Sequence, residues 1–439
     1  MNPTQIMVNY GLIVTFVFEK FIKVSKINAM ELHIPLRLPQ TFAALRHPNY
    51  RLWFIGQLVS LVGTWMQSTA QGYLVYTLTG SPAYLGYVSF AGGIPIWLFT
   101  LYGGVIADRM PRRNLLVITQ TTMLVLAFIL AGLVFIGVVQ PWHIVLMAFL
   151  LGLANAFDAP TRQAFVMELT GGEDLTNAIA LNSTMFNTAT MVGPAVAGFT
   201  YAWLGPGWCF TFNGLSFIAV IIALLLMRLP PFIPPERQES AITQLKEGVQ
   251  YVASHDTIRM LITNLGFISA FGFGVVALIP AWAVVVLGGD VRTNGLLLSS
   301  RGTGALIGAL MIAYLGRRRI KGKLWTIGSF SLPITLLIFT LVRWLPLSLL
   351  LACGLGWSFM MLVNTANALV QTQVDNGLRG RVMGIYMLTF QGLMPIGSLV
   401  IGLLASRLNE PIAVAMSGFV LIVMAIWVFI RKPNLRKLE

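Results

Sequence analysis

The chain has 439 residues, of which 56% are hydrophobic and only 10% are charged. Soluble domains carry about 25% charged residues, and the mean hydropathy here is +0.79, so the composition excludes a protein dissolved mainly in water. The net charge of +14 would suit a nucleic-acid partner, but the placement of the basic residues argues against one.

Long apolar stretches recur along the chain. A helix that crosses a bilayer needs about 20 predominantly apolar residues, and in lipid its backbone hydrogen bonds must be satisfied within the segment. The sequence therefore predicts an all-α membrane protein with twelve transmembrane helices. They lie at residues 52–78, 82–106, 115–138, 143–165, 178–203, 208–227, 260–287, 296–315, 324–342, 346–370, 382–405 and 412–430.

The basic residues follow a sidedness rule. If the predicted loops are assigned to alternate sides, 25 of the 29 Lys and Arg fall on the side of the N-terminus. The opposite side holds Arg292, Arg343 and Arg407, and Arg301 lies inside a span. Because Lys and Arg collect on the cytoplasmic side, we expect a multi-pass protein of the inner or plasma membrane with both termini cytoplasmic. The basicity then marks orientation, and no nucleic-acid partner is expected.

The spans divide into two groups of six. We expect a cytoplasmic N-terminal segment (1–49), a first bundle (50–228), a cytoplasmic linker (229–256), a second bundle (257–430) and a cytoplasmic tail (431–439). Prolines interrupt the linker, and Ile242, Leu245, Val249 and Val252 then recur at the spacing of an amphipathic helix. Residues 1–29 match nothing else in this plan, so Met30 is an alternative start, which N-terminal mass spectrometry would test.

Small-residue motifs repeat between the two groups at a constant offset of 204 residues. The three pairs are Gly152 and Gly356, Gly193 and Gly397, and Gly198 and Gly402. The last two pairs bound GPAVAG in helix five and GSLVIG in helix eleven. Internal duplication with a binding site between the repeats is a common plan of secondary transporters.

The loop after the second span reads GVIADRMPRR, from Gly104 to Arg113. It resembles the G-x-L-x-D-R-x-G-R-R signature of the major facilitator superfamily, with Pro111 in place of the usual glycine. TLTGSPAYLG, NAIALNSTMFNTATMVGPAVAG, LKEGVQYV and LRGRVMGIYMLTFQGLMPIGSLVIG resemble its efflux branch, which includes the enterobactin exporter and multidrug-type proteins. The resemblance covers about residues 42–429 and implies twelve helices in two six-helix pseudo-repeats, with transport by alternating access.

The charged loop, comprising Gly104, Asp108, Arg109, Arg112 and Arg113, is interpreted as a gating latch. The free backbone N–H groups that open helix eleven, near residues 381–384, carry partial positive charge. Asp108 is placed to accept hydrogen bonds from them, and Arg112 is placed to reach Asp158 on helix four. These contacts would hold the halves together while the protein is open outward. The alternative is that the cluster only sets topology.

In helix five, GPAVAG resembles the antiporter motif of exporters. Gly193 and Gly198 permit close helix contact, and Pro194 removes one hydrogen bond and favours a bend. Packing alone would explain this motif, and a gating role would be an addition to packing.

Helices one, four, seven and ten line the central cavity of the family. By resemblance, the candidate substrate path comprises Trp65, Gln67, Gln71, Tyr73, Asn155, Asn264, Trp357, Asn364 and Asn367. Polar residues in a span face a partner or water because exposure to lipid is costly. Hydrogen bonding between helices is therefore the alternative for each of them, and aromatic residues such as Phe271 and Phe273 suit packing.

Arg301 lies inside the predicted span 296–315, near the outer third of helix eight. We interpret it either as a side chain that snorkels to the outer surface or as a charge that attracts an anionic substrate. No Asp or Glu lies in the middle of any predicted span, and the family's helix-four arginine, expected near Ala148, is absent. If protons are the coupling ion, Asp158 or Asp108 would carry them by elimination.

These features favour a secondary active transporter, expected to be a monomer, that exports a small amphiphilic or anionic molecule such as a siderophore or drug. An uptake permease on the same fold and a non-transporting membrane protein are the alternatives. Cys209 and Cys353 both lie in apolar spans and give no disulfide or metal-ligand pattern. No nucleotide loop or nucleophile–base pair is visible, so we expect neither an enzyme nor a cofactor or metal.

Overall fold

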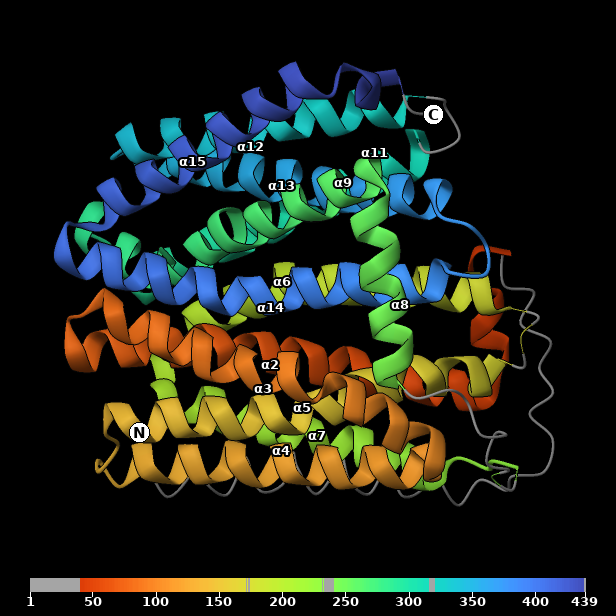
Figure 1. Cartoon of the computed structure of the whole chain (residues 1–439). Coiled ribbons are helices and arrows are strands. Elements are labelled where there is room, and N and C mark those ends of the chain that lie inside the picture. Colours follow the sequence, from red (N-terminus) through yellow and green to blue (C-terminus); the bar gives the residue numbers. More distant parts are fainter. Residues whose placement is uncertain are drawn as a thin grey trace.

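The computed structural model describes residues 40–170, 172, 174–230, 232, 241–315 and 320–437. The interpretation of residues 1–29 and of Met30 as a start falls outside these residues, as does most of the stretch 229–240. The described chain forms two bundles of long, roughly parallel helices, the first below the second in Figure 1. We call these bundles the first half and the second half.

The first half follows a short helical segment, η1 (Gln40–Arg46). It comprises α2 (Pro48–Thr79), α3 (Pro82–Arg109), α4 (Arg112–Phe135), α5 (Pro141–Thr170), α6 (Leu175–Leu204) and α7 (Pro206–Leu226). Proline at the first turn starts α2, α3 and α7, where its missing N–H costs nothing. Gly80 ends α2 in the left-handed conformation, with φ of 62° and its N–H bonded to the carbonyl of Tyr76.

The linker helix α8 (Ala241–Ser254) leads to the second half. There the seventh span is a chain of short helical segments, and five regular helices follow. The segments are α9 (Asp256–Phe267), η2 (Ile268–Phe273), η3 (Gly274–Leu278), α10 (Ile279–Ala281) and η4 (Trp282–Val286). The regular helices are α11 (Val291–Leu315), α12 (Lys321–Leu341), α13 (Leu345–Gln373), α14 (Arg379–Arg407) and α15 (Glu410–Arg431), and the short η5 (Pro433–Lys437) closes the described chain.

Each of the twelve predicted spans corresponds to one of these long helical stretches. Ten of them are long and apolar enough to cross a membrane. The other two, α2 and α6, have 32 and 30 residues but are more polar, so the count of twelve spans is not confirmed. Some of their polar residues are turned inward: Gln57, Gln67 and Gln71 in α2 and Asn187 in α6 are buried.

The repeated glycines make equivalent contacts in the two halves. A Cβ atom on Gly152 of α5 would lie 2.1 Å from the carbonyl oxygen of Gly92 in α3. A Cβ atom on Gly356 of α13 would lie 1.9 Å from the carbonyl oxygen of Arg301 in α11. Both glycines therefore bring two backbones into direct contact, as small residues do between membrane helices.

The second glycine pair behaves in the same way. A Cβ atom on Gly193 of α6 would lie 2.5 Å from the Cβ of Trp65 in α2, and one on Gly397 of α14 would lie 2.1 Å from the carbonyl oxygen of Ala270 in η2. The fifth helix thus packs on the first as the eleventh packs on the seventh. This correspondence agrees with the predicted duplication of the two halves.

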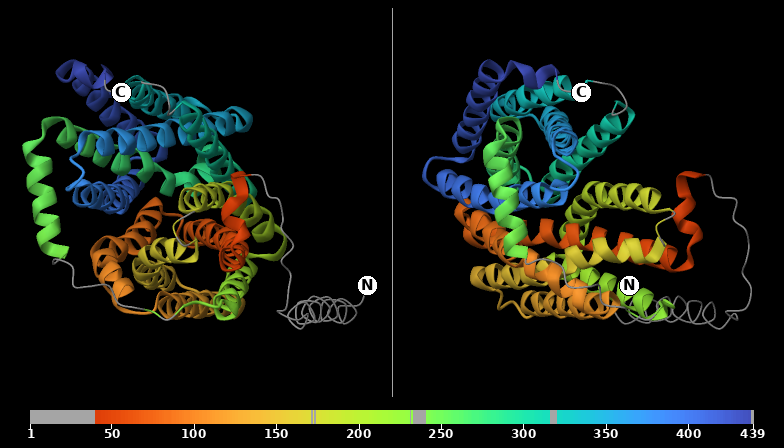
Figure 2. Two further views of the ribbon diagram at one scale, coloured as in Figure 1. Left: turned by 90° about the vertical axis from the view of Figure 1, so that its right-hand side faces the viewer. Right: turned by 45° about the vertical axis from the view of Figure 1, so that its right-hand side comes forward.

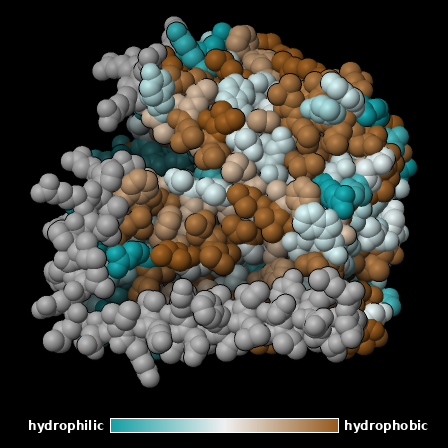
Figure 3. Space-filling model, turned by 180° about the vertical axis from the view of Figure 1, so that it is seen from behind, coloured by the Kyte–Doolittle hydropathy of each residue, from teal (hydrophilic) through white to brown (hydrophobic). Residues whose placement is uncertain are grey.

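The helix ends define two ends of the molecule. The end where α3 stops at Arg109 and α4 begins at Arg112 lies on the right in Figure 1, with α8 and the C-terminus, and we call it the basic end. Figure 2 shows from this end that the two halves lie one above the other. The far end, with Arg292, Arg343 and Arg407, is called the opposite end. Figure 3 shows largely hydrophobic colours between the ends on the rear face.

Candidate functional site: the path between the halves and its gates

Two seams join the halves near the opposite end. At the first seam, between α3 and α14, a Cβ atom on Gly402 would lie 2.9 Å from the carbonyl oxygen of Pro82, and one on Gly86 would lie 3.0 Å from that of Ser398. Further along, a Cβ atom on Gly93 would lie 2.0 Å from the ring of Pro395. The halves are therefore in backbone contact at this end.

The second seam joins α6 to α11 and contains the helix-five motif. A Cβ atom on Gly198 would lie 3.1 Å from the carbonyl oxygen of Val291, and one on Gly295 would lie 2.5 Å from that of Pro194. The hydroxyl of Ser299 also donates to the carbonyl of Met191 at 2.5 Å. GPAVAG thus packs on α2 through its first glycine and on the other half through Pro194 and Gly198, which supports the packing interpretation of the motif.

Toward the basic end the same helices separate. A Cβ atom on Gly104 of α3 would meet no atom within 4 Å, and the same holds for Gly380 and Gly384 at the start of α14. Seen from behind, Figure 3 shows a recess with hydrophilic colours at its left edge, which is the basic end. Near the opposite end the halves are therefore in backbone contact, whereas these three glycines of α3 and α14 at the basic end face open space.

The predicted latch is apart in this conformation. The side chain of Asp108 is 50% exposed, and its one ion pair within the described ranges joins it to Arg112 at 3.8 Å, four residues along the same chain. Arg112 also binds Glu168 at the end of α5, at 3.2 Å. Arg109 is exposed, and Arg113 approaches the carbonyl of Met227 at 3.5 Å. The predicted contact of Asp108 with α14 and the predicted pair of Arg112 with Asp158 are absent here.

Asp158 instead joins α5 to α4. It is 1% exposed, and its Oδ1 accepts hydrogen bonds from Thr119 at 2.8 Å and from Gln120 at 2.9 Å. Its Oδ2 lies 2.7 Å from Nε of Arg162, one turn along α5. This pair is close enough for an ion pair but lacks the angle of a hydrogen bond. A buried carboxylate with these partners is electrostatically satisfied.

In the first half, the candidate path residues split by burial. Gln67 is buried and accepts a hydrogen bond from Asn213 of α7 at 2.7 Å, and Gln71 is buried and donates to the carbonyl of Ile144 at 3.0 Å. Both amides therefore hold helices together, as the packing alternative expects. Asn155 is half-buried and donates to a carbonyl of its own helix. Trp65 packs against Phe186 and Tyr73 against Tyr201.

In the second half, Trp357, Asn364 and Asn367 are half-buried along α13. The amide of Gln371 donates to Oδ1 of Asn367 at 2.6 Å. Asn264 of α9 is 3% exposed, and its Oδ1 has no partner among the described residues. The three α13 side chains, like that of Asn155 in the first half, keep part of their surface exposed.

Arg301 is 8% exposed and lies inside the second half. Its guanidinium carbon sits 5.2 Å from the centre of the Phe273 ring. The snorkelling interpretation is therefore wrong, because the side chain stays in the bundle and does not extend to the outer surface. The physical reason is the direction in which α11 faces: its contacts with α13 turn Arg301 toward the seventh span and α12.

Several ion pairs at the basic end were missed from sequence. Arg162 stands four residues after Asp158, and this spacing predicts an ion pair within one helix. The pair of Arg112 with Glu168 joins two helices, and no sequence spacing predicts it. Glu247 of α8 pairs with Arg381 of α14, and Lys432 pairs with Asp256 at 2.9 Å. The linker helix α8 is thus bound to the first turn of α14, where the predicted latch would close.

The sequence is similar to those of two kinds of characterised protein. It is 26% identical to the staphyloferrin A transporter of Staphylococcus aureus (strain NCTC 8325 / PS 47) over 362 residues, which cover 81% of this chain and 89% of that protein. It is 25% identical to the enterobactin exporter EntS of Citrobacter koseri (strain ATCC BAA-895 / CDC 4225-83 / SGSC4696) over 402 residues, which cover 89% of this chain and 93% of that protein.

The structure is similar to those of solved transporters. A mutant form of the nucleoside transporter NupG matches with a TM-score of 0.70 at 15% identity, covering 87% of this chain and 99% of that one. A bacterial homologue of the human lysosomal transporter Spinster, in an inward-facing and occupied conformation, matches with a TM-score of 0.70 at 13% identity, covering 90% and 98%. At these identities the similarity shows the fold alone.

A family model covers nearly the whole chain. It matches residues 39–439, which include both halves, the linker and both seams. The match agrees with the resemblance to the major facilitator superfamily, which rested on the charged loop after the second span and on four further stretches. The chain is a multi-pass membrane protein of the transmembrane secretion effector family of major facilitator transporters.

Proposed function

We propose that this protein is a secondary active transporter that exports a small amphiphilic or anionic molecule, of siderophore or drug type, by alternating access. One observation carries this proposal: the halves are in backbone contact near one end, whereas at the other end the glycines of α3 and α14 face open space. The similarity to a staphyloferrin A transporter and to an enterobactin exporter supports the direction and the kind of substrate.

The basic end is cytoplasmic in this proposal. The loops with Arg109, Arg112 and Arg113 lie there, and Lys and Arg collect on the cytoplasmic side of membranes. Both termini are then cytoplasmic, the protein lies in the inner or plasma membrane, and the present conformation is open to the cytoplasm. A cargo molecule would enter from that side.

In the outward-open state, the end of α3 closes onto the start of α14. Gly104 and Gly384 now face open space, and two glycines allow close backbone approach. Asp108 then accepts hydrogen bonds from the free N–H groups of the first turn of α14, which favour a carboxylate. Arg112 leaves Glu168 and turns toward Asp158. The charged loop therefore acts as a latch in one of the two states.

The seam between α6 and α11 is the pivot of this movement. Gly193, Pro194 and Gly198 keep α6 in close contact with α2 and with α11. Interfaces of small residues can slide or tilt with little steric conflict, because few side chains interdigitate. The opposite end opens as the basic end closes.

The substrate path follows the half-buried polar residues Asn155, Trp357, Asn364 and Asn367. Protons are the proposed coupling ion, with Asp108 as the group that changes partners between the two states and Asp158 as the second carboxylate. The bundle is proposed to act as a monomer, because each half already supplies its half of the path.

Flux in membrane vesicles tests the proposal. Inside-out vesicles from an exporter-deficient host that expresses this chain are loaded from outside with a panel of siderophores and efflux dyes, with and without a protonophore. Accumulation that the protonophore abolishes is expected. Accumulation only in right-side-out vesicles would show an uptake permease, and no flux of any compound in either orientation would support a non-transporting membrane protein.

A further inference from the structure

Arg301 is held deep in the second half by close helix packing. It lies ten residues after Val291, the first residue of α11, or about 15 Å along the helix axis. Its neighbour Gly302 packs on Met191 of α6, and Gly304 packs on Cys353 of α13. Because these two contacts fix the rotation of α11, the side chain of Arg301 can project only into the interior of the second half.

The charge of Arg301 has no counter-charge among the residues that the structure describes. Its guanidinium makes no hydrogen bond or ion pair with any residue in the described ranges, and its Nε is buried without an acceptor. The contact with the Phe273 ring is its one electrostatic interaction there. Asp158, the buried charge of the first half, has three polar partners. Buried charges in proteins are normally paired, so Arg301 is in the state expected of an empty anion site.

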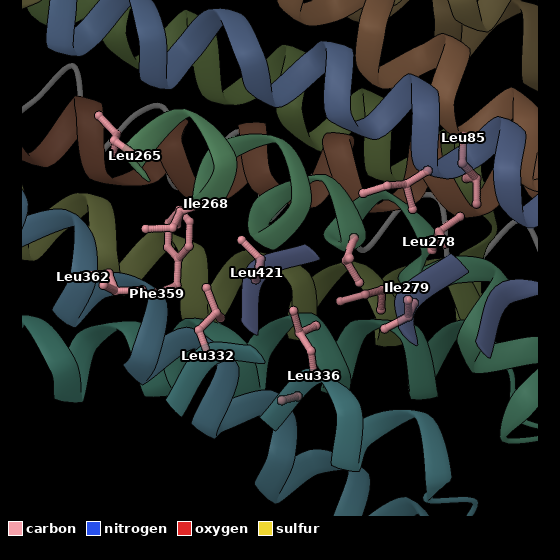
Figure 4. Close-up of a cluster of buried hydrophobic side chains, with 14 of the residues drawn as sticks. Leu85, Leu265, Ile268, Leu278, Ile279, Leu332, Leu336, Phe359, Leu362 and Leu421 are labelled. Atoms are coloured by element: carbon pink, nitrogen blue, oxygen red, sulfur yellow. The ribbon is translucent and has the colours of Figure 1, made fainter. Parts of the chain in front are cut away.

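A hollow lies beside this guanidinium. It measures about 460 Å³ together with its open mouth, and its enclosed part has room for about two water molecules. Of its lining residues, Arg301 alone carries a charge. The walls are apolar and partly aromatic, with Phe273 and Phe359 5.1 Å apart. All four of Phe359, Leu332, Leu336 and Ile279 line the hollow, and in Figure 4 Phe359 and Leu332 appear near each other, with Leu336 and Ile279 further along.

One wall of the hollow has an irregular backbone. In the seventh span, the π-helical segment η2 meets the 3-10 segment η3 between Phe273 and Gly274, and Gly272 and Phe273 line the hollow. Such interruptions within a helix are frequent at functional sites. The wall that carries the aromatic ring is therefore the part of the span least fixed by regular hydrogen bonds.

We propose that this hollow binds the carboxylate group of an amphiphilic anion, with Arg301 as the residue that holds the charge. A guanidinium offers a planar fork of donors that matches two carboxylate oxygens, and a carboxylate has about the size of the enclosed space. The apolar remainder of the molecule packs on Phe273 and Phe359 at the mouth. This assignment rests on the proposed export function and narrows its substrate class to carboxylates.

Thermal unfolding of the purified protein in lipid nanodiscs tests the site, with benzoate as the probe and benzamide as its neutral isostere. Benzoate is expected to raise the Tm in a saturable manner, and benzamide is not. Arg301→Gln is expected to weaken benzoate binding at least tenfold, equivalent to about 1.4 kcal/mol, and Arg301→Lys to weaken it less. Arg343→Gln is the matched control, because Arg343 also lies over an aromatic ring, Trp282, but outside the hollow.

Three results would overturn the site: equal stabilisation by benzamide, unchanged benzoate binding in Arg301→Gln, or full competition by chloride at constant ionic strength. A folding role is distinguished by Arg301→Met without any ligand. If the charge is unpaired, this variant keeps or raises the Tm, whereas a large fall would show that Arg301 is structural. Benzoate binding without flux in vesicles would contradict only the export function, and flux that is unchanged by Arg301→Gln would contradict only the site.

Discussion

The two adjacent glycines of α3 provide a sharp test of alternating access, because the same substitution meets different surroundings. A Cβ atom on Gly103 would lie 2.3 Å from the carbonyl oxygen of Ala156 in α5, whereas one on Gly104 would meet nothing within 4 Å. Contacts below 3.0 Å are essentially never seen for Cβ atoms, so Gly103→Ala must move α3 and α5 apart by at least 0.7 Å.

The expected effects on stability are opposite in sign. Overpacking of this kind costs about 1–3 kcal/mol, which lowers the Tm by roughly 2–12 °C for a unit of the size of each half. In Gly104→Ala the new methyl group is unobstructed, and replacing a helical glycine by alanine stabilises by up to about 1 kcal/mol. Its Tm is therefore expected to stay the same or to rise by a few degrees.

For Gly104→Ala, export is expected to fall although the stability of the protein does not. If α3 closes onto α14 at Gly104, the added methyl group penalises that state by about 1–3 kcal/mol, and its population falls by a factor of about 5–150. Export by Gly104→Ala should fall accordingly, although the protein is folded. The measurements are Tm by tryptophan fluorescence and flux in inside-out vesicles. Wild-type export by stable Gly104→Ala would refute closure at this position.

Three further predictions concern charge and packing. Asp108→Asn is expected to abolish export but to leave membrane insertion normal, because the first turn of α14 holds a neutral amide less strongly than a carboxylate. Flux measures export and surface labelling measures insertion. Wild-type flux in this variant would contradict the proposed latch. Asp158→Ala should lower the unfolding free energy by about 3–5 kcal/mol, and adding Arg162→Met should restore part of the Tm; a purely additive double mutant would contradict the ion pair. Gly397→Ala should lower the Tm more than Gly193→Ala, because the first meets a backbone oxygen at 2.1 Å and the second a side-chain carbon at 2.5 Å. An equal Tm loss would show that these two helix contacts, one within each half, relax alike.

The sequence by itself determined the helical membrane class, the positions of the long helices and the duplication. Hydrophobic length and the satisfaction of backbone hydrogen bonds are local constraints, so they can be read without a partner helix. The constant offset between the glycine pairs was also visible in the sequence. Each close backbone contact leaves no room for a side chain, so glycine is required at the equivalent position of both halves. The number of spans was harder to judge, since α2 and α6 contain polar residues that other helices cover.

Only the tertiary structure decided which way each polar side chain points. Gln67 and Gln71 are as polar as Asn364, but their hydrogen-bond partners lie on α7 and α5. Their side chains therefore join helices within the first half and do not face the proposed substrate path. Arg112 has Glu168 as its partner in the state seen here, which no spacing along the chain predicts. Arg301 turns inward because two helices pack against its neighbours. Hydropathy fixes the depth of a residue in the membrane, whereas its direction depends on the rotation of its helix, which is set by contacts between residues far apart in the chain.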